Sequence, residues 1–236
     1  MKLALEHDWE LTPREAIALQ KELAPRVVHR DDFGPLKHIA GTDVGFENGG
    51  KTTRAAVVIM DADSLEVIEQ VLHREPTRFP YVPGLLSFRE IPALIAALEQ
   101  LKSMPDLLMC DGQGIAHPRR LGIAAHLGVI TGLPALGVGK SRLTGKHEEP
   151  GNERGDWAPL IDKDETIGRV LRTRANVKPV YVSIGNRVSL PTAMKLVLRF
   201  TTRYRLPEPI RAADRLSSSR KQGSAMDRMD RRRRAD

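Results

Sequence analysis

The sequence predicts an α/β fold built on one mixed sheet, with three antiparallel strands followed by parallel strands and flanking helices. Two observations lead to this prediction. Three apolar segments follow one another closely in the first third of the chain, which favours an antiparallel meander. Further along, short apolar segments alternate with helical patterns, which indicates right-handed parallel crossovers. A chain of 236 residues can bury a substantial core as one large domain.

The first predicted element is a helix. Residues 12–15, with the sequence TPRE, are typical of a capping box with proline at the first helical position, and the helix should extend to about Leu23. Strands are then expected over residues 36–46, 54–60 and 65–72. The middle segment is continuously apolar and the last alternates apolar with polar residues, which predicts a buried strand beside a half-exposed one.

The remaining elements alternate between helices and strands. Ser87 is expected to be the N-cap of a helix that ends at Met104-Pro105. A strand is expected at 107–110, a helix that opens at 117–120, and a strand at 133–138. Two further strands and two further helices are expected at 167–173, 179–184, 191–200 and 210–216. Three antiparallel strands followed by helix, strand, helix and strand are in the order of the ribonuclease-H-like fold.

Composition and charge indicate a soluble protein with a polyanionic partner. The single cysteine, Cys110, excludes an internal disulfide and a multi-cysteine zinc site, and it suits a cytoplasmic location. We find no signal-peptide pattern and no run of about 18 apolar residues, so no membrane span is expected. The net charge of +7 favours binding of nucleic-acid phosphates, although a solubilising surface explains the same charge.

Much of this charge lies at the C-terminus. Residues 220–236 carry seven Arg or Lys and three Asp, a net charge of +4, which leaves about +3 for the rest of the chain. We expect residues 1–216 to form the folded domain and residues 217–236 to be a basic, disordered tail. Either the tail has no function or it attracts phosphates non-specifically.

Three acidic residues lie where they could hold a metal ion. Asp43 is within the first apolar strand, Glu90 is in the first turn of the following helix, and Asp111 is at the carboxyl end of the fourth strand. If the first and fourth strands are neighbours, these carboxylates share a crevice. Their repulsion and burial favour a divalent cation that prefers hard oxygen ligands, such as Mg²⁺. Such an ion can activate a water molecule beside a phosphodiester.

Each carboxylate also has a structural explanation. Asp43 could cap a strand turn, and Asp111 followed by Gly112 is a common turn signal. Glu90 lies three residues after Ser87 and completes an S-x-x-E capping box. The spacing alone leaves the metal-binding and structural explanations open.

Four ordered motifs resemble a known family. They are GTDVGF at 41–46, PYVPGLLSFRE at 80–90, DGQGIAHPRRLG at 111–122 and GVGKSRL at 137–143. Together they resemble the signature of the endonuclease V family of repair nucleases, and matching sequence extends over roughly residues 11–215. The resemblance implies a ribonuclease-H-like endonuclease domain. It also implies cutting at the second phosphodiester bond 3′ to deoxyinosine or inosine, which leaves a 3′-hydroxyl and a 5′-phosphate.

The same resemblance implies a set of catalytic residues. Asp43 and Asp111 would be metal ligands, and Glu90 would be the third catalytic carboxylate beside the metal. Lys140 would stabilise the developing phosphate charge or position the water, with a solvated strand-end lysine as the structural alternative. Asp214 matches a position at which the family has an acidic residue or a histidine near the metals. The implied cofactor is Mg²⁺, for which Mn²⁺ can substitute.

A second group of residues would recognise the base. Tyr81, held by prolines such as Pro83, would act as a wedge whose ring replaces lost stacking, or it packs over its own loop. His117 would contact a phosphate or cap the following helix. Backbone N–H donors facing O6 of hypoxanthine would reject adenine, which carries an amino group there. The pocket for the flipped base would be lined, largely through backbone groups, by Gly84, Leu86, Gly122 and Ile123.

Several functions are compatible with these motifs. An inosine-directed DNA endonuclease is the first, and an endonuclease for inosine-containing RNA or a structure-selective nuclease is the second, which substrate competition separates. Binding without cleavage in magnesium would favour a third, a nucleic-acid-binding protein with an inactive site. A Rossmann-type enzyme is disfavoured because Gly112-x-Gly114 lacks the third glycine. We expect the protein to be a monomer that binds nucleic acid and does not bind a membrane. Asn186 stands where the family often has histidine, which leaves its contacts open.

Overall fold

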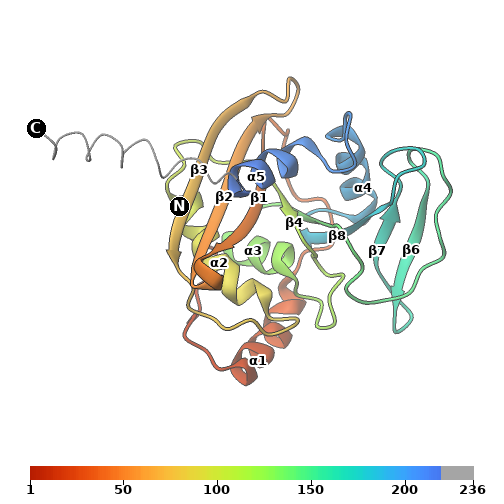
Figure 1. The fold of residues 1–236 in the computed structure, drawn as a ribbon. Coiled ribbons are helices and arrows are strands. Elements are labelled where there is room, and N and C mark those ends of the chain that lie inside the picture. Colours follow the sequence, from red (N-terminus) through yellow and green to blue (C-terminus); the bar gives the residue numbers. More distant parts are fainter. Residues whose placement is uncertain (219–236) are drawn as a thin grey trace, which may run out of the picture.

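The core of the molecule is an eight-stranded mixed sheet. A computed structural model describes residues 1–218, and the remainder of the predicted tail lies outside the described residues. The strand order is β3-β2-β1-β4-β5-β8-β7-β6, with helices on both faces (Figure 1). Strands β1, β4 and β5 pair in parallel, and the other neighbours pair antiparallel. The mixed α/β fold predicted from the sequence is confirmed.

The antiparallel meander consists of β1 (His38–Glu47), β2 (Thr52–Asp61) and β3 (Val67–Pro76). All three were predicted, because their apolar segments are long and separated by clear turns. Successive side chains of a strand face opposite sides of the sheet. Accordingly Val57 and Val58, neighbours in β2, pack into different core clusters on the two faces. The continuously apolar strand β2 is therefore buried on both faces of the sheet.

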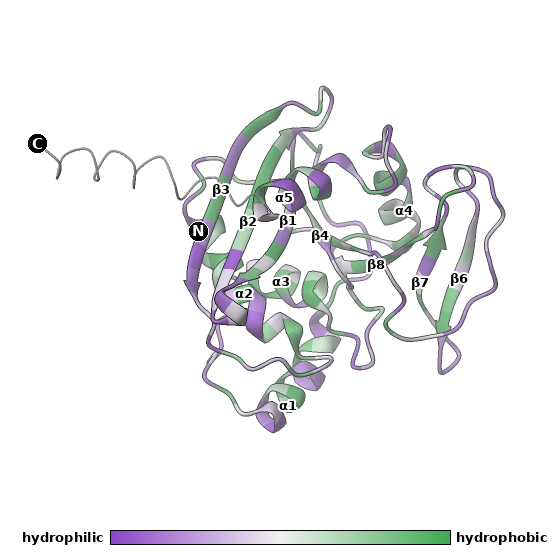
Figure 2. Cartoon of the chain, viewed as in Figure 1, coloured by the Kyte–Doolittle hydropathy of each residue, from purple (hydrophilic) through white to green (hydrophobic). Residues whose placement is uncertain are grey.

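The parallel strands β4 (Leu107–Asp111) and β5 (Ala135–Gly139) follow the meander through two crossover helices. These are α2 (Leu86–Glu99) and α3 (Ile123–Thr131), whose buried residues pack together against the same sheet face. Helix α3 is almost entirely buried, and Figure 2 colours it mainly hydrophobic. Helix α1 (Pro13–Leu23) begins at the predicted capping box of Thr12 and contacts α3.

The far side of the sheet is antiparallel. Strand β8 (Val180–Asn186) pairs with β5, and β7 (Glu165–Leu171) and β6 (Trp157–Asp162) extend the sheet outward. Strand β6 was not predicted. Exposed and buried residues alternate along it, and it contains Pro159, a residue that is uncommon within strands. Proline is tolerated there because β6 is an edge strand.

Helices α4 (Leu190–Arg199) and α5 (Glu208–Ser218) cover the second face of the sheet. Gly41 of β1 allows the close approach of α5, since a Cβ atom there would lie 1.9 Å from the carbonyl oxygen of Pro209. Helix α5 includes Ser217 and Ser218, which are the first two residues of the predicted tail. Among residues 1–218, we find no helix long and apolar enough to cross a membrane.

Two predicted helix starts are wrong. Helix α2 begins one residue before Ser87, and its N-cap is Leu85 without a side-chain hydrogen bond. Helix α3 begins at Ile123, six residues later than predicted, because the preceding segment forms a turn. Both errors lie beside the cavity described below: α2 begins earlier than expected, and a turn replaces the expected first turn of α3.

Candidate active site

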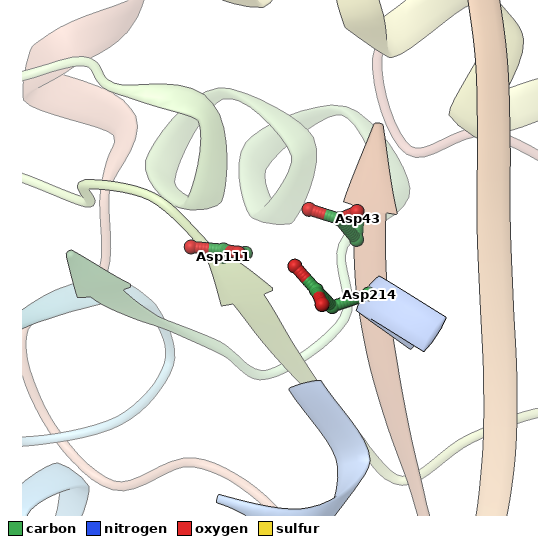
Figure 3. A group of neighbouring side chains, drawn as sticks. All are labelled: Asp43, Asp111 and Asp214. Atoms are coloured by element: carbon green, nitrogen blue, oxygen red, sulfur yellow. The ribbon is translucent and has the colours of Figure 1, made fainter. Parts of the chain in front are cut away.

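Three aspartates from distant parts of the sequence converge on one side of the sheet. Asp43 lies on β1, Asp111 ends β4, and Asp214 lies on α5 (Figure 3). One carboxylate oxygen from each lies within 4.8 Å of the others. The parallel pairing of β1 with β4, in which Thr42 is opposite Cys110, brings Asp43 next to Asp111. The docking of α5 at Gly41 then brings Asp214 over both.

Lys140 is the counter-charge of this cluster. It follows β5, and its Nζ atom lies 2.5 Å from Oδ2 of Asp111 and 3.0 Å from Oδ1 of Asp214. Burial acts to lower the pKa of Lys140, but the hydrogen bonds and charges of the two aspartates outweigh it and raise the pKa above its ordinary value. The lysine is therefore charged at pH 7.

Glu90 lies on α2, is 8% exposed, and is close enough to Asp43 and Asp111 to be affected by their charges, although it is not part of the group of three aspartates. Burial, followed by the charges of Asp43 and Asp111, raises the pKa of Glu90 to about 8. Burial also raises the pKa of Asp111 to about 6, against the opposing effect of Lys140. At pH 7 Glu90 therefore retains its proton, whereas Asp111 is mostly ionised and paired with Lys140.

The donor set fits a divalent cation with hard oxygen ligands. Asp43, Asp111 and Asp214 offer carboxylate oxygens at a spacing that one ion can bridge. Asp43 has a hydrogen bond from the hydroxyl of Ser217, which donates to Oδ2 and leaves the other carboxylate oxygen available. A bound cation would favour the ionised carboxylates and oppose the burial and repulsion that raise the two pKa values. This chemistry supports a divalent-metal site.

A cavity of about 370 Å³ adjoins the cluster. Its volume suits a small-molecule or nucleobase ligand. The walls combine residues from the cluster with the predicted base-binding residues. The cavity is lined by the predicted residues Tyr81, Pro83, Gly84, Leu86, Glu90, Asp111, His117, Gly122, Ile123 and Lys140, and by others that include Ser87, Gln113 and Leu121.

The loop before α2 forms one wall of the cavity. Gly84 has φ of +78°, a backbone conformation that L-residues rarely adopt, so glycine is required at this turn. Tyr81 is 71% exposed and Leu86 is 40% exposed, so both side chains are displayed at the cavity rather than packed in the core. This exposure argues against the alternative in which Tyr81 packs over its own loop.

Ser87 does not cap α2 as expected. Its hydroxyl is hydrogen-bonded to Nδ1 of His126 at 3.0 Å. The predicted capping box with Glu90 is therefore absent, because the helix starts one residue earlier and the hydroxyl turns to α3. The carboxylate of Glu90 therefore does not cap α2, and it is free to interact with Asp43 and Asp111.

His117 holds the turn before α3. Its Nε2 donates to the carbonyl of Gly84 at 3.0 Å, and its Nδ1 accepts from the backbone N–H of Arg119 at 3.1 Å. Burial, and then the charge of Arg119, lowers the pKa of His117 to about 4, so the ring is neutral at pH 7. It does not cap α3, whose N-cap is Gly122. The structure places His117 as a link between two cavity walls.

Asn186 is buried and fully engaged. Its Nδ2 donates to the carbonyls of Gly128 and Leu133, and its Oδ1 accepts from the backbone N–H of Val28. It lies behind α3 and does not line the cavity. The departure from histidine at this position therefore concerns packing.

Two residues beside the site were not identified from the sequence. Gln113 lines the cavity, and its Oε1 is a buried acceptor without a hydrogen-bond partner among the described residues. It lies in the motif DGQGIAHPRRLG, which was the available signal. Ser217, which donates to Asp43, had no signal because it lies in the segment predicted to be a tail.

A mixed sheet whose central strands β1 and β4 carry clustered carboxylates, beside a cavity of nucleobase size, is typical of a nuclease with a ribonuclease-H-like architecture. A family model described as Endonuclease V matches residues 21–215. The chain is 60% identical to the Endonuclease V of Azotobacter vinelandii over 213 residues, which are 90% of this chain and 96% of that relative. The chain therefore belongs to the endonuclease V family, as its motifs suggested.

Solved structures agree with this assignment. The Endonuclease V of Streptomyces avermitilis superposes with a TM-score of 0.85 at 45% identity, covering 90% of this chain and 94% of that one. The Endonuclease V of Ciona intestinalis, in complex with a DNA containing an inosine followed by a ribo-adenosine, has a TM-score of 0.75 at 28% identity, with coverage of 86% and 95%. The ribonuclease-H-like fold and the family membership are thus established.

Proposed function

We propose that this chain is a DNA repair endonuclease that cuts at the second phosphodiester bond 3′ to deoxyinosine and leaves a 3′-hydroxyl and a 5′-phosphate. One observation carries the proposal. Glu90, Asp111 and Lys140 line the same cavity as the glycine loops expected to receive the base. A flipped base in that cavity would hold its own strand beside the acidic cluster. The inosine-containing DNA bound by the Ciona relative supports the same substrate class.

Asp43 and Asp111 would be the principal ligands of a divalent cation, with Glu90 and Asp214 completing its surroundings. Carboxylate oxygens in this number favour Mg²⁺, and Mn²⁺ should substitute for it. When bound, such an ion supplies charge neutralisation and a water of lowered pKa. The role of the protein is to hold the carboxylates in place, with Asp43 oriented by Ser217 and Asp111 by Lys140.

Lys140 would stabilise the negative charge that develops on the scissile phosphate. Its ammonium group is held at the cluster by Asp111 and Asp214, so it needs little reorganisation during the reaction. The solvated-lysine alternative is disfavoured by these two ion pairs. Lys140 is thus proposed as a catalytic residue that contacts the phosphate.

The glycine loops would recognise the flipped base. Tyr81 would occupy the gap left in the stack, because its exposed ring lies on a loop stiffened by prolines. Backbone N–H groups near Gly84, Leu86 and Ile123 would donate to acceptor atoms of hypoxanthine, and Gly122, whose own N–H donates to the carbonyl of Gly114, would shape the pocket wall. Adenine presents an amino donor in place of O6 and would leave those N–H groups unpaired.

His117 supports recognition rather than phosphate binding. Both of its ring nitrogens already have partners, and the ring is neutral. We therefore propose that it fixes the loop of Gly84, not that it contacts a phosphate.

Cleavage of inosine-containing RNA is the second candidate. The DNA bound by the Ciona relative carries a ribo-adenosine after the inosine, so that relative accommodates a 2′-hydroxyl at the neighbouring nucleotide. The acidic cluster of this chain has no group that requires a deoxyribose. We expect a monomer to be sufficient for either substrate, because the described residues of one chain line the whole cavity.

The test is to map the cut. Purified protein is incubated in Mg²⁺ with end-labelled oligonucleotides that carry one deoxyinosine or one inosine, with matched adenine controls. We expect a single product that ends after the nucleotide 3′ to the lesion and carries a 3′-hydroxyl. EDTA should abolish the product, and Mg²⁺ or Mn²⁺ should restore it. Binding without cleavage in Mg²⁺ would instead support an inactive binding protein.

A further inference from the structure

Gln20 connects the two loops that form the walls of the cavity. It lies on α1, is completely buried, and is not among the residues that line the cavity. Its Nε2 donates to the carbonyl of Gly84 at 3.0 Å and to the carbonyl of Leu121 at 3.1 Å. Gly84 belongs to the loop before α2, and Leu121 to the loop before α3. One amide nitrogen therefore joins both walls from behind.

The carbonyl of Gly84 is held by more donors than Gln20 alone. It also accepts from Nε2 of His117 at 3.0 Å and from Nη2 of Arg119 at 2.7 Å. The Nε of Arg119 donates in turn to Oε1 of Gln20. Both ends of the Gln20 amide are therefore engaged, which fixes its orientation and leaves no freedom for the group to rotate.

We propose that Gln20 is a positioning residue that sets the spacing of the two loops, and with it the fit of a flipped purine base. This inference rests on the proposed function, in which the cavity receives hypoxanthine. Gln20 does not touch the base. It acts through the carbonyls of Gly84 and Leu121, which belong to the two loops that line the cavity.

The chemistry of the side chain explains why glutamine suits this position. Its amide nitrogen offers two donors for two carbonyls, and its oxygen accepts from Arg119. Glutamate has the same length but no donor, so it would direct a second oxygen at two carbonyl oxygens. Leucine has a similar volume but makes none of the three bonds. Asparagine keeps the amide but is one methylene shorter.

The test compares the affinity for a duplex that carries the base with the affinity for a duplex that lacks it. Three labelled duplexes differ at one position, which holds deoxyinosine, deoxyadenosine or a tetrahydrofuran abasic site. Binding is measured by fluorescence anisotropy in EDTA, so that no strand is cut. We expect Gln20→Leu and Gln20→Glu to lower the preference for deoxyinosine over the abasic site about tenfold, which is roughly 1.4 kcal/mol. The affinity for the abasic duplex should not change.

Two further variants separate positioning from general loss of structure. Val197→Ala in α4 removes core packing far from the cavity walls and calibrates the effect of lower stability. We expect it to leave the preference unchanged. Gln20→Asn retains the amide group, and its preference for deoxyinosine over the abasic site should lie between those of the native protein and Gln20→Leu. This variant also tests the proposal if Gln20→Leu folds poorly.

The outcomes distinguish this inference from the proposed function. If native protein prefers deoxyinosine and the Gln20 variants retain that preference, the role of Gln20 is overturned. The same conclusion follows if they lose affinity for all three duplexes equally, as a structural defect would cause. If native protein itself binds the three duplexes equally, the proposed function fails, and the inference fails with it.

Discussion

The acidic cluster and the adjoining cavity, which is the proposed base pocket, differ in how completely their polar groups are paired within the described residues. On the pocket side, the carbonyl of Gly84 has three donors and both ring nitrogens of His117 have partners. On the cluster side, Glu90 and Asp111 have raised pKa values. Among the described residues, Lys140 is the one side chain that forms ion pairs with the cluster.

This difference indicates how the chain divides recognition from chemistry. The proposed base pocket is positioned by bonds formed during folding, so it would select a base without further ordering. The cluster is assembled by the sheet and α5 and gathers carboxylates, whose charge a divalent cation would neutralise. Mutations in the two regions should therefore affect different measurements.

The largest effect is expected from Asp111→Ala. Removing this carboxylate should lower the single-turnover cleavage rate of deoxyinosine DNA by roughly 10³-fold or more, because it removes a metal ligand and the partner of Lys140. Affinity for the same DNA should remain within a few-fold of native. Asp162→Ala, an ion-paired aspartate outside the cavity, is the matched control and should cut normally. Normal cutting by Asp111→Ala would remove this residue from the mechanism.

A smaller effect, on the other region, is expected from Tyr81→Ala. Stacking on an aromatic ring contributes roughly 1–3 kcal/mol per base, so discrimination between deoxyinosine and adenine should fall about tenfold or more. Cutting of flexible or mismatched DNA should fall less. Tyr204→Ala, an exposed tyrosine outside the cavity, serves as the control. Unchanged discrimination in competition assays would contradict the wedge role.

The smallest effect is expected in stability. The pKa of Glu90 is about 8 in the folded chain and near 4.5 when unfolded, so the folded state holds a proton that the unfolded state has released. Stability in EDTA should therefore fall as pH rises through 8. Histidines with a lowered pKa, such as His117, act in the opposite direction but only below about pH 6.5.

The measurement is the thermal unfolding midpoint between about pH 6.5 and pH 8.5. We expect a decline of a few degrees in EDTA and its reversal by Mg²⁺, which stabilises the ionised carboxylates. Glu90→Gln has no proton to lose and should show a flatter profile. A native profile that is flat in EDTA would mean that the cluster is already balanced.

The sequence predicted most of the fold because its apolar periods are clear. The meander, the crossover strands and α5 all lie at or near their expected positions. No strand was predicted at β6, which contains Pro159, and its place at the sheet edge is what makes the proline acceptable. The start of α3 was misplaced because the segment around His117 is held as a turn by contacts with a loop 33 residues earlier.

The candidate site was predictable only where motifs marked it. Asp43, Glu90 and Asp111 each lie in one of the four motifs, although only Asp111 lies at a strand end, and Glu90 is beyond the first turn of α2 because that helix begins earlier than expected. The proximity of Asp214 depends on the close approach of α5 to Gly41, which no local pattern contains. Gln20 gave no signal, because a glutamine within an amphipathic helix is ordinary, and its partners lie 64 and 101 residues away.

The most direct test of the account is to locate a cation in the crystal. Crystals soaked in Mn²⁺ can be examined by anomalous scattering, which identifies the ion without reference to activity. We expect a peak bound by Asp43 and Asp111, at roughly 2.0–2.2 Å from their oxygens. Data of good quality with no peak between these two aspartates, or with manganese bound only outside the cavity, would contradict the account.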